Sequence, residues 1–114
     1  MDLKLLVIRT NQMEVLVKFY QLFGLEFEYH QHNNSPFHFA ANIGEMVFEI
    51  YPLAKNQLVA DNNLRLGFSI DNFEEFIDTL TKNECKFTSP TQTDFGFLTI
   101  VTDPDGRKIE VYKK

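Results

Sequence analysis

The chain has no tryptophan, one cysteine and no long uninterrupted apolar stretch in its 114 residues. One cysteine excludes an internal disulfide and is typical of a reducing compartment, so we expect a cytoplasmic location. The apolar segment near the N-terminus is too short for a signal peptide or a membrane helix. These absences predict a protein that makes no membrane contact.

Positive charge is also scarce. Lys and Arg number 11 against 16 Asp and Glu, which gives a formal net charge of -5. The only basic cluster is Lys113-Lys114 at the end of the sequence. Because phosphate binding needs a basic face, a nucleic-acid partner is not expected. The 44% hydrophobic content, with 12 Phe, is enough for one well-filled core.

The apolar pattern predicts the same order of elements twice. The first half has a strand at 3–10, an amphipathic helix at 12–23 and strands at 25–32, 36–42 and 46–51. The second half has a strand at 64–70, a helix starting at Asp71 or Asn72, and strands at 85–88, 95–102 and 108–112. Each half is therefore a predicted βαβββ module.

The two halves superpose with an almost constant offset. Met13 matches Phe73 at an offset of 60 (73 − 13), and Glu49 matches Glu110 at 61 (110 − 49). Such a repeat indicates duplicated modules. We predict an α+β domain over 1–114, with module 1 at about 1–54, a linker at about 55–63 and module 2 at about 64–114. The two tandem βαβββ modules would form a curled eight-stranded mixed sheet around a cavity.

Several short motifs occur in a particular order along the chain. They are Phe19-Tyr20 with Phe23-Gly24-Leu25, Ser69-Ile70-Asp71-Asn72, and Asp103-Pro104-Asp105-Gly106 with Lys108-Ile109-Glu110. In this order the chain resembles the vicinal oxygen chelate superfamily. That group includes glyoxalase I, bleomycin-resistance proteins, fosfomycin-resistance enzymes and extradiol dioxygenases. The resemblance implies eight strands curled into an incomplete barrel around a cavity.

The resemblance also implies four positions for metal ligands, on the first, fourth, fifth and eighth strands. They correspond here to Leu5, Glu49, Arg65 and Glu110. Leucine has no donor atom, and arginine stays protonated and has no lone pair to offer. We therefore predict a degenerate metal site and no cofactor. A divalent metal held by His38, Glu49 and Glu110 is a disfavoured alternative.

Side-chain alternation along the strands places these four residues on one predicted face. Arg65 would lie between Glu49 and Glu110 and neutralise both carboxylates in the space that a metal would take. Two alternatives stay open. The glutamates could be structural partners of Arg65 or catalytic bases, and Arg65 could instead bind a ligand carboxylate or phosphate.

The first tight turn, around residues 42–45, predicts the partner of His38. Pairing Ala41 with Met46 across this turn places His38 opposite Glu49. His38 is then a polar wall of the cavity or, less favourably, a catalytic base. Tyr51 would line the same cavity.

The second turn, at residues 103–106, predicts two further pairs. Pairing Thr102 with Arg107 places Thr99 opposite Glu110. The same register places Phe97 opposite Tyr112. The predicted ligand-binding residues are thus Arg65, His38, Tyr51, Tyr112, Phe97 and Thr99. By contrast, we expect His30 and His32 to face solvent beside Glu26 and Glu28.

The depleted metal site favours a metal-independent small-molecule-binding protein, with an unknown organic ligand in the concave sheet, as in the bleomycin-resistance branch. One alternative is a glyoxalase-type lyase or isomerase with Glu49 or Glu110 as the base. Another is a non-catalytic interaction subunit. A dioxygenase is least favoured, because two histidines and a carboxylate for iron are missing. Exposed sheet edges predict a homodimer.

Overall fold

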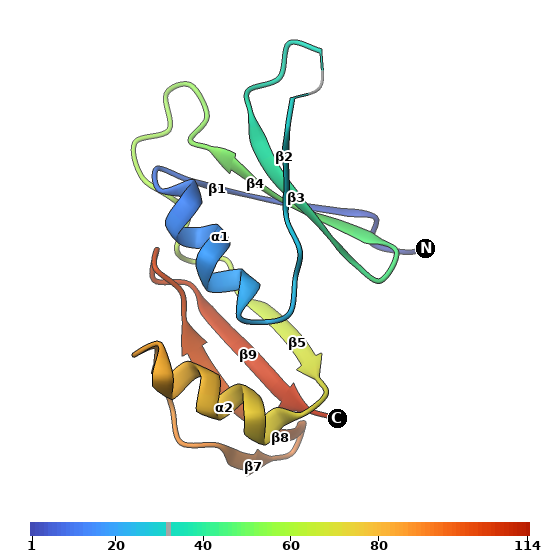
Figure 1. Cartoon of the computed structure of the whole chain (residues 1–114), viewed down its shortest axis with the longest axis vertical. Coiled ribbons are helices and arrows are strands. Elements are labelled where there is room, and N and C mark those ends of the chain that lie inside the picture. Colours follow the sequence, from blue (N-terminus) through green and yellow to red (C-terminus); the bar gives the residue numbers. More distant parts are fainter. Residues whose placement is uncertain (32) are drawn as a thin grey trace. The chain divides into compact units, whose positions relative to one another are not determined.

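The protein consists of two compact units, and the computed structural model describes residues 1–31 and 33–114 (Figure 1). Unit 1 comprises Met1–Asp61 and unit 2 comprises Asn62–Lys114, so the division falls within the range 55–63. Each unit has its own sheet and contains a βαβββ module, to which unit 2 adds one short strand. The predicted α+β fold of two tandem modules is confirmed.

Unit 1 contains one helix and a four-stranded mixed sheet. Its elements are β1 (Leu5–Thr10), α1 (Met13–Gln21), β2 (Glu28–His30), β3 (His38–Ile43) and β4 (Met46–Pro52). The strand order is β1-β4-β3-β2, with β1 parallel to β4 and the other pairs antiparallel. The predicted strand at 25–32 is shorter in the structure, and His32 lies outside the described residues.

Unit 2 repeats this topology and adds a short strand. Its elements are β5 (Leu66–Ile70), α2 (Phe73–Lys82), β6 (Lys86–Phe87), β7 (Thr91–Thr93), β8 (Gly96–Thr102) and β9 (Lys108–Lys113). The strand order is β5-β9-β8-β6, and β7 pairs with β8. The described residues thus form nine strands in two unclosed sheets. The pattern did not predict β7, because Thr91-Gln92-Thr93 lacks apolar alternation.

The core of unit 1 lies between α1 and one face of its sheet. Leu16 and Tyr20 of the helix are buried, and the Tyr20 ring lies edge-on to Phe48, with centroids 5.2 Å apart. Alternation along β4 places Phe48 and Ile50 on this helix-covered face. The other face of the sheet is therefore available for a site. Figure 1 shows α1 on one side of its sheet.

The core of unit 2 follows the same plan. Phe73, Phe76 and Leu80 of α2 are buried together with apolar residues of β8 and β9. Asn72 occupies the N-cap position, but its side chain makes no capping bond and its φ is 54°. Asn72, one of the two predicted starting positions, thus begins α2 without a capping bond from its side chain. Across the described ranges, neither helix is long and apolar enough to cross a membrane.

The hairpin between β3 and β4 is tighter than the sequence predicted. Ile43 pairs with Met46, so the loop has two residues, and Gly44 adopts a φ of 59° that favours glycine. The predicted pairing of His38 with Glu49 is wrong by two residues, because Glu49 pairs with Ala40. A shift of two keeps each side chain on its face, so His38 stays on the face that carries Glu49.

The hairpin between β8 and β9 is looser than predicted, and a buried arginine is the reason. Arg107 is fully buried, and its Nη1 donates to Asp103 Oδ2 at 3.1 Å and to Asp105 Oδ2 at 2.9 Å. Its backbone N–H donates to Asp103 Oδ1 at 3.0 Å. Arg107 is thereby drawn into the loop, and Thr102 pairs with Lys108 instead. This one-residue difference exchanges the faces predicted for β8.

Candidate functional site

The open face of the unit 1 sheet, opposite α1, carries most of the predicted residues of that unit. Parallel pairing places Val7 beside Glu49, and Arg9 beside Tyr51. Leu5 pairs with Val47 one row further along the strands. The faces predicted for the first and fourth strands are confirmed by these pairs.

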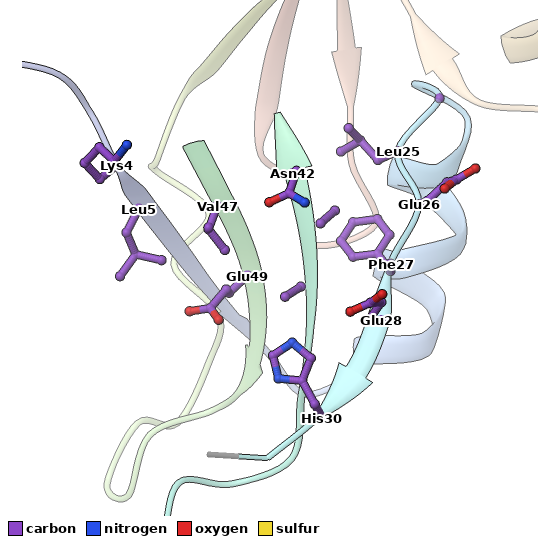
Figure 2. A pocket seen from close by; sticks show the side chains of 13 residues that line it. Lys4, Leu5, Leu25, Glu26, Phe27, Glu28, His30, Asn42, Val47 and Glu49 are labelled. Atoms are coloured by element: carbon purple, nitrogen blue, oxygen red, sulfur yellow. The ribbon is translucent and has the colours of Figure 1, made fainter. Parts of the chain in front are cut away.

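A hollow of about 890 Å³ opens on this face (Figure 2). The hollow is lined by Lys4, Leu5, Gly24, Leu25, Glu26, Phe27, Glu28, His30, Ala40, Ala41, Asn42, Val47 and Glu49. Figure 2 shows that Asn42, Val47 and Glu49 come from adjacent strands. Phe27 comes from the segment leading into β2, and Glu28 is the first residue of that strand. All lining residues belong to unit 1. The hollow therefore combines apolar walls with several carboxylates.

Glu49 is the most buried carboxylate of the hollow, and His38 holds it. Its side chain is 12% exposed, and its Oε2 lies 3.3 Å from Nε2 of the fully buried His38 ring. The other ring nitrogen, Nδ1, lies 3.0 Å from the carbonyl oxygen of Pro36. A carbonyl only accepts, so this hydrogen bond assigns a proton to Nδ1. The contact between Nε2 and Glu49 Oε2 is an ion pair when the ring carries a proton on both nitrogens.

His38 belongs to a row of stacked side chains that crosses all four strands. Its ring stacks on Tyr51 at 4.2 Å and 9°, and the Arg9 guanidinium carbon lies 5.0 Å from the centre of the Tyr51 ring. On the other side, His30 meets His38 edge-to-face at 4.6 Å. Tyr51 is thus packed between Arg9 and His38. The row fixes the His38 ring and, through it, the orientation of Glu49.

His30 and Glu28 were missed as site residues by the sequence analysis. Antiparallel pairing sets Glu28 opposite Ala40 and His30 opposite His38, so both residues lie on the face of the hollow. His30 is half-buried, so the predicted solvent exposure is wrong for it. Strand alternation predicts that residues 28 and 30 share a face. Assigning that face to the hollow requires the register of β2 against β3, which the sequence did not give. His32, predicted alongside, lies outside the described residues.

The matching glutamate of unit 2 has a different environment. Arg65 Nη2 donates to Glu110 Oε2 at 2.9 Å, and the Tyr112 hydroxyl donates to Oε1 at 2.5 Å. Both carboxylate oxygens therefore already have a donor. The hydrogen bond to Glu110 raises the pKa of Tyr112, assisted by desolvation and the negative charge, while Arg65 opposes the rise. The predicted pairing of Arg65 with Glu110 is present in unit 2.

The surface above this pair is only shallow. A hollow of about 380 Å³ is lined by Arg65, Leu66, Gly67, Phe68, Ser69, Glu110 and Tyr112. The Arg65 side chain is 56% exposed. Gly67 pairs with Glu110 and has no side chain to cover it. The site leaves the guanidinium accessible, but the carboxylate beside it is already hydrogen-bonded.

Two predicted ligand-binding residues face the other way. Thr99 pairs with Val111 rather than Glu110, is fully buried, and donates to the Thr88 carbonyl oxygen at 2.6 Å. Phe97 contacts Phe73 of α2, with ring centroids 5.6 Å apart. Both residues lie on the helix-covered face because Arg107 lengthens the loop that follows β8 and shifts its register against β9 by one residue. The predicted pairs Thr99–Glu110 and Phe97–Tyr112 are wrong.

The donor atoms do not suit the metal site that the superfamily resemblance implies. Leu5 offers no ligand atom, Arg65 is a cation, and Glu110 accepts hydrogen bonds on both oxygens. Within residues 1–31 and 33–114, no group of three or more His, Cys, Asp or Glu is placed to hold a metal ion. Glu49, the fourth position, is paired with His38. The predicted contact of Arg65 with Glu49 joins different units and stays a prediction.

Comparison with known families gives one match over nearly the whole chain. The model of the Glyoxalase/Bleomycin resistance protein/Dioxygenase superfamily matches residues 3–111. No curated protein sequence matches the chain.

Solved structures share the fold at low sequence identity. An antibiotic-binding protein, TnmS3 from Streptomyces sp. CB03234, has 16% identity and a TM-score of 0.81, covering 99% of this chain and 95% of that one. Lactoylglutathione lyase from Agrobacterium tumefaciens has 14% identity and a TM-score of 0.73, with coverages of 98% and 92%. An integron cassette protein from the mobile metagenome of V. cholerae has 19% identity and a TM-score of 0.75, with coverages of 99% and 94%. At these identities the likeness concerns the fold.

Proposed function

The chain belongs to the glyoxalase/bleomycin resistance protein/dioxygenase superfamily, and on that premise we propose that it is a metal-independent small-molecule-binding protein. Its ligand is an organic molecule held in the hollow of unit 1. One observation carries the proposal: Glu49, held by His38, lies in a hollow of about 890 Å³ with apolar walls. A concave apolar site with a few fixed polar groups is typical of small-molecule binding.

The hollow provides both parts of such a site. Leu25, Phe27 and Val47 supply apolar surface, and its burial against a ligand contributes about 25 cal/mol per Å². Glu49 supplies a polar anchor whose orientation is already fixed by the buried His38 ring. Preorganisation of this kind reduces the entropy lost on binding. The similarity to an antibiotic-binding protein agrees with this function.

A second candidate function is a glyoxalase-type lyase or isomerase. The specific observation in its favour is the same His38–Glu49 pair, because a half-buried carboxylate with a fixed orientation can accept a proton from a bound substrate. Glu110 is less suited to this role, because Arg65 and Tyr112 already donate to both of its oxygens. Turnover of a glutathione hemithioacetal that is lost in Glu49→Gln would establish this alternative.

A thermal-shift panel tests the proposal. Planar aromatic compounds and antibiotics that bind the native state should raise the melting temperature, since a ligand at about 100 times its Kd adds about 2.7 kcal/mol. Ni²⁺, Zn²⁺, Mn²⁺ and Fe²⁺ should leave it unchanged. A metal-dependent rise would contradict the metal-independent function, and a response to neither class would favour an interaction subunit.

The location of binding needs a matched pair of variants. Ala40 lies in the hollow, and Glu45 lies on the turn of the same hairpin, outside it. Ala40→Trp should fill the hollow and abolish the ligand-induced shift, whereas Glu45→Trp should preserve it. Equal ligand responses in the two variants would place the ligand elsewhere.

A further inference from the structure

We propose that the hollow of unit 1 selects organic cations, molecules that combine a protonated nitrogen with an apolar or aromatic part. This inference rests on the proposed function and adds the charge class of the ligand. It comes from the arrangement of carboxylates around one small residue. The net charge of the chain alone does not show that these carboxylates lie together.

Two carboxylates flank an alanine in the same row of the sheet. Ala40 pairs with Glu49 on one side and with Glu28 on the other, and directly paired residues share a face. Their strands lie two spacings apart, about 10 Å, with Ala40 between them. Ala40 is too small to fill the space over the sheet. A ligand nitrogen placed above Ala40 would therefore have a carboxylate on each side.

The formal charge of the lining is negative. Glu26, Glu28 and Glu49 carry three negative charges against the single positive charge of Lys4, so the sum is −2 (1 − 3) with His30 and the adjacent His38 counted as neutral. Lys4 precedes Leu5 and lies in a different row from Ala40, since its carbonyl oxygen accepts from Val47 N–H. A cation bound beside Glu49 and Glu28 would gain charge-assisted hydrogen bonds, which are about twice as strong as neutral ones. An anion would be repelled.

The same hollow offers apolar surface for the rest of the ligand. Leu25, Phe27 and Val47 line it, and the half-buried Phe27 ring also contacts the core ring of Phe48, with centroids 6.2 Å apart. An aromatic ring attracts a cation over its face and also packs against flat apolar groups. The Asn42 side chain adds a carbonyl oxygen as a further acceptor. A neutral or anionic ligand would use only part of these groups.

Three naphthalene probes with a cationic, a neutral and an anionic substituent test the inference. They are 1-naphthylmethylammonium, 1-naphthylmethanol and 1-naphthoate, titrated into the full chain while backbone amide shifts of Phe27, Asn42 and Glu49 are followed by NMR. We expect the cation to bind at least about tenfold more tightly than the alcohol, the range for a hydrogen bond to a charged group. The carboxylate should bind most weakly.

Variants of the two flanking carboxylates complete the test. Glu49→Gln and Glu28→Gln should each weaken the cation about tenfold and leave the alcohol unchanged, while Glu45→Gln on the turn should change neither. Glu28 is exposed, so its variant remains informative if loss of the His38–Glu49 pair prevents folding. Equal binding of the three probes in the hollow would overturn the charge selectivity and leave the proposed function standing. Shifts with none of them would overturn both.

Discussion

Unit 1 and unit 2 place a glutamate at the same point of the same sheet and surround it differently. Glu49 pairs with Ala40 on β3, and Glu110 pairs with Ile100 on β8. The parallel neighbours are Val7 in unit 1 and Gly67 in unit 2. In unit 1 the small residue lies between carboxylates, and the hollow above it has a volume of about 890 Å³. In unit 2 the larger Ile100 occupies that position.

The donors differ as well. Glu49 is held by a buried imidazole on the neighbouring strand, and Glu110 by an exposed guanidinium and a phenol. The strand register shows which positions of the two units correspond. His38 corresponds to Leu98, since each lies two residues before the antiparallel partner of the glutamate, and Leu5 corresponds to Arg65 in the parallel strand. The comparison teaches that the residues at these two neighbouring positions decide the state of the glutamate. The carboxylate is either accessible to a ligand, as in unit 1, or hydrogen-bonded within the protein, as in unit 2. Exchanging residues between matching positions therefore tests it.

The largest expected effect concerns the β8–β9 hairpin, where unit 2 departs most from the two-residue turn of unit 1. Arg107→Met should destabilise the protein by about 3–5 kcal/mol, because the buried carboxylates of Asp103 and Asp105 would lose the guanidinium that neutralises them. Denaturant unfolding measures this loss, and hydrogen exchange should show it first in unit 2.

Lys108→Ala is the control for that hairpin. The Lys108 side chain is exposed and donates only to Thr102 Oγ1 in the described structure, so its loss should change stability by less than about 0.5 kcal/mol. Equal losses in the two variants would show that Arg107 does not set the stability of the hairpin.

Next in size is the conversion of unit 1 toward unit 2 by His38→Leu. The substitution leaves the Pro36 carbonyl and Glu49 without the imidazole, and should cost about 1–3 kcal/mol. His38→Gln, which keeps an N–H donor, should lose less. Chemical denaturation of both variants measures the difference, and a His38→Leu protein as stable as the original would remove the assigned role of the ring.

A pH effect is expected from unit 2. The bond to Glu110 raises the pKa of Tyr112 above its ordinary value of about 10, so it contributes stability below that pH and loses it as the pH rises through the raised value. Glu110→Gln should lower the pKa of Tyr112 toward the ordinary value and flatten the loss of stability above about pH 10. Absorbance of tyrosinate, with Tyr112→Phe to identify the transition, measures the pKa.

Among the exchanges between matching positions, the smallest change in stability is expected for Arg65→Leu, which installs the residue that unit 1 has at that position. The pair is exposed, so the cost should be only about 0.2–1 kcal/mol. The pKa of Tyr112 should rise further, because the positive charge of Arg65 lowers it in the original protein. The same titration distinguishes the two variants, since Glu110→Gln and Arg65→Leu should shift the pKa in opposite directions.

The fold was predictable because its signals are repeated and local. The apolar spacing of Phe73, Phe76 and Leu80 predicted α2, and the offset between Glu49 and Glu110 predicted the duplication. Faces along single strands were also predictable, since alternation depends only on the strand itself. β7 was missed because hydrogen bonds to β8 stabilise it rather than an apolar face.

The site was only partly predictable because it depends on the pairing between strands. Composition suggested a turn at 103–106, but the burial of Arg107 decided its length and turned Thr99 toward the helix. In unit 1 the error was an even number of residues, so His38 kept its face and its contact with Glu49. Glu28 became recognisable as a site residue once its partner Ala40 was known.

The buried arginine of the last hairpin also bears on which changes in chain length unit 2 can accept. Removing one residue between Thr102 and Lys108 would strain the ion-paired loop or slide β8 by one position against β9. Sliding would turn the buried Val101 outward and bring the polar Thr102 into the core. Insertions and deletions should therefore be tolerated in the 55–63 segment. In this loop they should destabilise unit 2, because the ion pairs of Arg107 fix the number of residues between β8 and β9.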